Sequence, residues 1–118
     1  MQIQIKRIYA PAETQDGYRV LVDRLWPRGV SKAAARVDYW WKDGAPTSAL
    51  RGWFNHEAAK WEVFQKRYFA ELDANEEIVN AFIEEMGDRR VTLLFAAANE
   101  EQNHALALKI YLEKLDAH

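Results

Sequence analysis

Two short runs of apolar residues constrain the fold of this chain more than any other feature of its sequence. Residues 18–23 read YRVLVD and residues 91–96 read VTLLFA, and each run is bounded by residues typical of turns or helix ends. Such continuous runs are typical of strands that are covered on both faces, as in a parallel sheet. Elsewhere, apolar residues recur at helical spacing. The sequence therefore predicts an α/β fold with three layers, in which helices flank a small, mostly parallel sheet.

A further strand and several helices complete the predicted fold. Residues 2–8 alternate apolar and polar side chains, which indicates a half-buried strand. Its connection to residue 18 is too short for a helical crossover, so the direction of this strand stays open. The expected helices lie over residues 32–35 with Ser31 as N-cap, from Thr47 or Ser48, from 57 onward, from 75 to Gly87, and from 99 to about 115. The stretches that begin at 57 and 75 form either one bent helix or two.

The size and composition are those of an ordinary globular domain. The 118 residues suffice for a single domain, 1–118, with one core. The formal charge of −2 argues against broad binding to a phosphate backbone, which needs a strong excess of Lys and Arg. No cysteine is present, which excludes disulfides, thiolate nucleophiles and cysteine zinc sites. No segment resembles a signal peptide or a membrane span, so we expect a cytoplasmic protein without membrane contact.

The first candidate site follows the strand expected around residue 20. Ligands bind open α/β sheets beyond the carboxyl ends of their strands, and the sequence DRLWPRG occupies that place at 23–29. Arg24 and Arg28 suit a bidentate clamp on a phosphate or carboxylate. An equally weighted alternative is that both arginines pair with nearby acids and so hold a loop in place. Trp26 either stacks on a ring of the ligand or covers the core under the loop.

The second candidate site follows the strand at 91–96, where three alanines lead into a helix. Small residues followed by a helix N-terminus form a place where backbone N–H groups and the helix dipole favour a bound anion. Asn99, with Gln102 three residues on, resembles a capping box and predicts that the helix starts there. His104 then faces inward in the first turn and Asn103 looks out from an adjacent face. His104 either points at a ligand or is a core-edge histidine bonded to a carbonyl.

Other titratable residues give weaker signals. Asp23 is the one acid at the carboxyl end of a predicted strand, where a general base belongs. The histidines at 56, 104 and 118 have no close ligand spacing, so we expect no metal site. No phosphate-binding or dinucleotide-binding glycine motif is present, and no cofactor is predicted.

Several motifs are spread along the chain. They are DGYRVLVDRLWPRG at 16–29, Trp40 and Lys42, Pro46-Thr47, Leu50-Arg51, the helix around 64–72, and TLLFAA followed by Gln102-Asn103-His104-Ala105. Together they resemble the YeaO-like group of small bacterial proteins, within the domain-of-unknown-function family numbered 488. The resemblance implies an α/β fold and no particular reaction. It places these residues among the family's motif residues: Arg24, Trp26, Arg28, Lys42, Arg51, Asn103 and His104.

One departure from the family bears on chemistry. More distant members carry a Cys-His-Arg motif on what looks like the equivalent last helix, whereas this chain has Asn103-His104-Ala105. A thiol mechanism therefore does not carry over. The motif residues are rich in Arg and Lys and poor in acids, which suits holding an anion better than abstracting a proton or binding a metal.

Three hypotheses follow. In the first, the domain binds a phosphorylated or other anionic small molecule, nucleotide-like ligands included, with or without enzymatic turnover. Its expected ligand-binding residues are Arg24, Trp26, Arg28, Lys42, Arg51 and Asn103, with His104 as acid or base if there is turnover. In the second, a stripe of basic and aromatic residues binds nucleic acid. In the third, the arginines and tryptophans form an internal network that fixes loops in an interaction protein.

Overall fold

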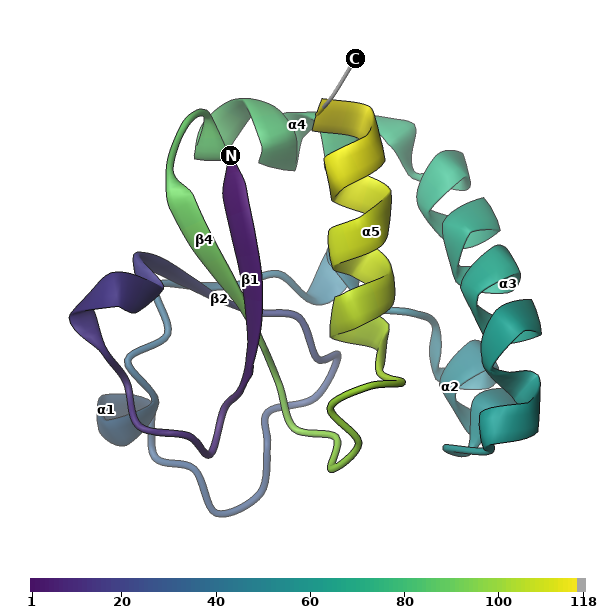
Figure 1. Ribbon diagram of the computed structural model, residues 1–118, viewed down its shortest axis with the longest axis horizontal. Coiled ribbons are helices and arrows are strands. Elements are labelled where there is room, and N and C mark those ends of the chain that lie inside the picture. The colour runs from purple at the N-terminus through teal and green to yellow at the C-terminus, as the bar shows by residue number, and fades with distance from the viewer. Residues whose placement is uncertain (117–118) are drawn as a thin grey trace.

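The computed structural model describes residues 1–116 and places both apolar runs side by side at the centre of one sheet (Figure 1). The strands are β1 (Gln2–Arg7), β2 (Tyr18–Leu21), β3 (Tyr39–Trp40) and β4 (Arg90–Phe95). They lie in the order β1-β4-β2-β3, and each neighbouring pair is parallel. The predicted α/β class is confirmed. The short edge strand β3 was not predicted.

The direction of β1, which the sequence left open, is parallel to the other strands. Gln2 to Arg7 pair in register with Arg90 to Phe95 of β4. β4 lies between β1 and β2, so the connection over residues 8–17 joins two strands that are not neighbours. That connection contains only the short 3-10 helix η1 (Thr14–Asp16). The chain therefore returns from the end of β1 to the start of the parallel strand β2 without an α-helical crossover.

Five α-helices and two further 3-10 helices surround the sheet in the described residues. They are α1 (Lys32–Ala35), α2 (Ser48–Phe54), α3 (Trp61–Ala74), α4 (Glu76–Met86) and α5 (His104–Asp116), with η2 (Lys42–Gly44) and η3 (Ala58–Lys60). Ser31 and Thr47 are the N-caps of α1 and α2, as predicted. α3 and α4 are two helices that break at Asn75. None of these helices combines the length and the apolar character needed to cross a membrane.

The start of α5 differs from the prediction. Asn99 does accept hydrogen bonds from two following backbone N–H groups, but these close a turn ahead of the helix. The N-cap is Asn103, whose Oδ1 accepts from the Leu106 N–H at 2.9 Å, and the helix begins at His104. The expectation that Asn103 looks outward is wrong, because its side chain is buried against the end of the sheet.

The two faces of the sheet are covered unequally. Alternate residues of β4 point to opposite sides: Val91, Leu93 and Phe95 join the large cluster beneath α2, α3, α4 and α5, whereas Leu94 joins the small one. The small cluster lies under α1 and the loop around Trp26. Figure 1 shows α5 and α3 standing together beside the strands, with α1 alone at the far side. The face of the sheet covered by α2, α3, α4 and α5 therefore holds most of the core.

A buried carboxylate anchors the connection between β1 and β2. Asp16 is 2% exposed and forms ion pairs with Lys6 and Arg19, while its Oδ2 accepts the Glu13 N–H. Burial of the Asp16 carboxyl acts to raise its pKa, but the hydrogen bonds from Glu13, Lys6 and Arg19 outweigh that effect and hold the pKa below its ordinary value. The ionised form of Asp16 therefore stabilises the fold.

We predict that Asp16→Asn lowers the free energy of unfolding by about 3 kcal/mol near pH 7, because two cations lose their shared carboxylate. A lowered folded-state pKa means that this stabilisation is present above the ordinary carboxyl pKa and is lost as the pH falls through the folded-state pKa. Urea titrations of wild type and variant near pH 7 and near pH 2.5 test this. An equal difference in stability at both pH values would contradict the prediction.

Candidate functional site

The carboxyl ends of β2 and β4 meet at Asp23, which follows β2 by two residues. Its Oδ2 accepts the backbone N–H of Ala96, just beyond β4, at 3.0 Å. Its Oδ1 lies 2.8 Å from Nε2 of His104, the first residue of α5. One carboxylate therefore joins the ends of two central strands to the start of the last helix.

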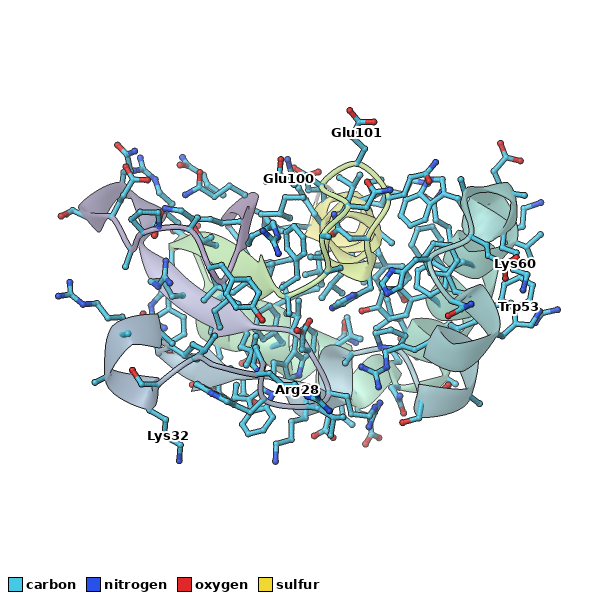
Figure 2. The ribbon with its side chains drawn as sticks, turned by 90° about the horizontal axis from the view of Figure 1, so that it is seen from below. Arg28, Lys32, Trp53, Lys60, Glu100 and Glu101 are labelled. Atoms are coloured by element: carbon cyan, nitrogen blue, oxygen red, sulfur yellow. The ribbon has the colours of Figure 1, made fainter. Side chains whose placement is uncertain are left out.

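A cavity of about 510 Å³, here called the strand-end cavity, lies beside this junction. Its walls come from α2 and the turn after it, from the chain just beyond β4, and from the start of α5. Phe54 and Phe64 form an apolar side. The polar residues that line it are Asp23, Ser48, Arg51, Asn55, His56, Asn103 and His104. Figure 2 views the molecule from the side to which the strands' carboxyl ends point, with α5 seen end-on.

Three buried polar atoms at the strand-end cavity lack a hydrogen-bond partner. They are Asp23 Oδ1, Arg51 Nε and His104 Nε2, and no other buried side-chain nitrogen or oxygen in residues 1–116 shares this condition. Asp23 Oδ1 and His104 Nε2 are close enough for a charge contact, but their alignment is not that of a hydrogen bond. Buried polar groups in native proteins are nearly always satisfied, so this concentration marks the cavity.

Arg51 differs from the other arginines that are at least partly buried. Arg7 donates to the carbonyls of Ala96 and Ala97, Arg19 pairs with Asp16, and Arg24 donates to two carbonyls. Within residues 1–116, Arg51 forms no ion pair, and its Nε has no acceptor. A buried donor without an acceptor costs about 1–3 kcal/mol. The guanidinium is therefore available to an anion.

Three of the predicted site residues come together at this cavity: Arg51, Asn103 and His104. Asn103 is already occupied, because its Oδ1 caps α5 and its Nδ2 donates to the Asn99 carbonyl. His104 contacts a carboxylate and not a carbonyl, which was the alternative considered for it. Arg51 and His104 are thus the predicted residues that retain unpartnered polar atoms in the cavity.

The other predicted residues lie outside the lining of the strand-end cavity. The Arg24 guanidinium donates to the carbonyls of Ala45 and Pro46, and so pins the loop ahead of α2 through carbonyls and not through acids. The Trp26 indole donates to a carbonyl at 2.7 Å and packs on the smaller core cluster. Lys42 Nζ lies 4.0 Å from the ring centroid of Trp40.

Arg28 is exposed, and Figure 2 shows it across the view from Glu100 and Glu101, which project from the loop ahead of α5. The two strand ends do converge, but the DRLWPRG loop contributes only Asp23 to the cavity.

Sequence reasoning missed several lining residues. Ser48, Asn55 and His56 were not proposed as site residues, although all three belong to α2 or the turn that ends it. Asn55 carried a signal, since asparagine at a helix end is typical of a left-handed C-cap, and its φ is 44°. His56 follows with a φ of 56°, which no sequence pattern indicated. In the described residues, no three His, Asp or Glu side chains gather as metal ligands.

Comparison with known proteins identifies the family. A family model described as "Inactive DUF488-N3 subclade" matches residues 2–117. The uncharacterized protein YeaO of Escherichia coli strain K12 is 44% identical over 115 residues, which cover 98% of this chain and 100% of that protein. The uncharacterized proteins Rv3073c of Mycobacterium tuberculosis and Mb3100c of Mycobacterium bovis are each 42% identical over 71 residues, or 60% of either chain. No solved structure matches the chain.

The family model covers nearly the whole chain, and the match to YeaO covers all of that protein. The resemblance inferred from the motifs is therefore confirmed: the chain belongs to the YeaO-like proteins of the DUF488 family, in the subclade described as inactive.

Proposed function

We propose that this protein binds a small organic anion, a phosphate or a carboxylate, in the strand-end cavity, with Arg51 as the principal contact. The observation that carries this function is the partly buried guanidinium whose Nε has no acceptor in the described chain. Arginine's planar fork suits two oxygens of one anion. A bound anion would supply the acceptors that the protein itself does not.

The start of α5 supports an anion at the same place. Asn103 and His104 line the cavity and form the N-cap and the first residue of a 13-residue helix. The N-terminal end of a helix carries a partial positive charge, so an anion gains stabilisation there. The Asp23 carboxylate opposes this field, but it already contacts His104 and the Ala96 N–H.

The dimensions of the cavity favour a ligand larger than an inorganic ion. A volume of about 510 Å³ lies within the range of about 300–1,000 Å³ that is usual for sites of organic ligands. Phe54 and Phe64 offer an apolar wall on which the body of such a ligand would pack. The anionic group would lie at Arg51 and the carbon skeleton against the two rings.

Binding without turnover is the activity that the chemistry favours. The family model that matches the chain is described as inactive. Asn103 stands where distant relatives have the cysteine of their Cys-His-Arg motif, and both ends of its amide are used to hold α5. No nucleophile replaces that cysteine within the motif. We place this binding in the cytoplasm, as expected from the sequence.

This proposed site replaces part of the expected contact set. Arg24 is held by carbonyls and Arg28 is exposed, so Arg51 takes the role that the sequence suggested for them.

We predict that Arg51→Gln weakens binding of an organic anion at least tenfold, since a hydrogen bond to a charged group contributes about 1.5–3 kcal/mol. Thermal shift with phenyl phosphate, benzoate, a sugar phosphate and a nucleoside monophosphate identifies probes, because a ligand raises Tm by mass action. Calorimetry then measures Kd for wild type and variants. Arg28→Gln is the matched control and should leave Kd within twofold. Equal loss in both variants would contradict a site at Arg51.

Nucleic acid remains the alternative that has a specific observation in its favour. Residues 24–42 carry five Arg or Lys and one Asp, although the whole chain has a charge of −2. Arg24, Lys42 and Arg51, the expected stripe, point to three different surroundings: a loop, the Trp40 ring and the cavity.

We therefore predict no saturable binding of a labelled single-stranded oligonucleotide at 150 mM salt, measured by fluorescence anisotropy. Binding that falls steeply as salt rises, and that Arg28→Gln weakens while Arg51→Gln does not, would favour the nucleic-acid alternative.

A further inference from the structure

We propose that His56 is a second anion-binding residue of the strand-end cavity, and that the ligand's anionic group is a phosphate monoester. This role rests on the proposed function. The backbone at the end of α2 is in a left-handed conformation at His56, and His56 is one of the residues that line the cavity.

The backbone of residues 55 and 56 is unusual. Asn55 has φ 44° and ψ 37°, and His56 has φ 56°, so two consecutive residues other than glycine lie in the left-handed region. Most side chains with a Cβ are disfavoured there, although asparagine is common at a helix C-cap, and glycine adopts this region without the penalty. Strain of this kind concentrates at binding and active sites. In the described chain, the only other non-glycine residue with positive φ is Arg36, at 47°.

The turn itself does not need the imidazole. Its hydrogen bonds run between backbone groups: the Asn55 N–H donates to the Arg51 carbonyl, and the Glu57 N–H donates to the Phe54 carbonyl. The His56 side chain is exposed and lies with its ring centroid 6.2 Å from that of Phe54. Glycine would satisfy the same backbone hydrogen bonds with less strain. The imidazole therefore adds a polar group to the cavity and not to the fold.

The number of donors indicates the class of anion. A guanidinium fork binds two oxygens, which accounts for both oxygens of a carboxylate. His56 and His104 are lining residues from two different segments, and the His104 imidazole already contacts Asp23, which leaves His56 as the second candidate donor. A phosphate monoester has three terminal oxygens, so it offers acceptors to Arg51 and to an imidazole at once. A carboxylate has two oxygens and a single charge, whereas a phosphate monoester at neutral pH has a third terminal oxygen and a charge of about −1.5 to −2, so it gains more from a second donor group.

The test compares two glycine substitutions with matched backbone effects. His56→Gly relieves a left-handed residue at the cavity, whereas Arg36→Gly relieves one at the end of α1, outside the cavity lining. Each should raise Tm by about 2–4 °C through relief of strain. Calorimetry at neutral pH and 150 mM salt then measures Kd for phenyl phosphate and for benzoate, two probes with the same ring and different anionic groups.

We expect His56→Gly to weaken phenyl phosphate binding about five- to tenfold and benzoate binding less than twofold, because the phosphate has a further oxygen and a larger charge for the imidazole to contact. Arg36→Gly should change neither Kd by more than twofold. Unchanged phenyl phosphate binding in His56→Gly, with loss in Arg51→Gln, would overturn the role of His56 and leave the proposed function standing. Binding of neither probe by wild type would overturn both. A fall in Tm for His56→Gly that Arg36→Gly does not share would show that the imidazole stabilises the turn and would also overturn this role.

Discussion

The Asp23 carboxylate is the contact on which the geometry of the candidate site depends. One of its oxygens takes the Ala96 N–H and the other meets His104, so the ends of β2 and β4 and the start of α5 share a single buried group. Asp23 is 8% exposed, and a buried polar group needs such contacts because its burial without them costs free energy. His104 is the first residue of α5, so this contact lies at the start of the helix. The strand-end cavity lies beside it.

The contact between Asp23 and His104 also bears on why the Arg51 guanidinium has no ion-pair partner in the described residues. A carboxylate that already contacts an imidazole and a backbone N–H is not the partner of Arg51, which forms no ion pair in the described residues. The partly buried arginines at 7, 19 and 24 are instead matched to carbonyls or to a carboxylate. Carbonyl and carboxylate acceptors for arginine are therefore present in the chain, but they contact these three arginines and not Arg51. The exception at Arg51 is therefore local, and it coincides with the cavity.

The central strands could be predicted from the sequence because strands buried on both faces have continuous apolar runs. These two runs are short, as strands are, and helices are usually longer. The sequence did not predict the start of α5, because Asn99 and Asn103 are both residue types that cap helices, and in the structure Asn99 closes a turn while Asn103 caps the helix. The sequence also did not indicate where the Arg24 side chain points. β2 ends at Leu21, so strand alternation no longer applies, and the acceptors of Arg24 lie more than twenty residues further along the chain. Local patterns carry no information about such distant acceptors.

Two kinds of departure from local consistency coincide at the strand-end cavity, although a third left-handed residue, Arg36, lies outside it. Unsatisfied buried atoms and paired left-handed residues are separate kinds of cost, and a fold has no need to put them together. Here Asp23, Arg51 and His104 supply the first and Asn55 with His56 the second, and all five line the strand-end cavity. Sequences tend to break local rules where a site requires it and to obey them elsewhere. The proposed anion site would account for this coincidence, because a ligand would supply partners for the unsatisfied atoms.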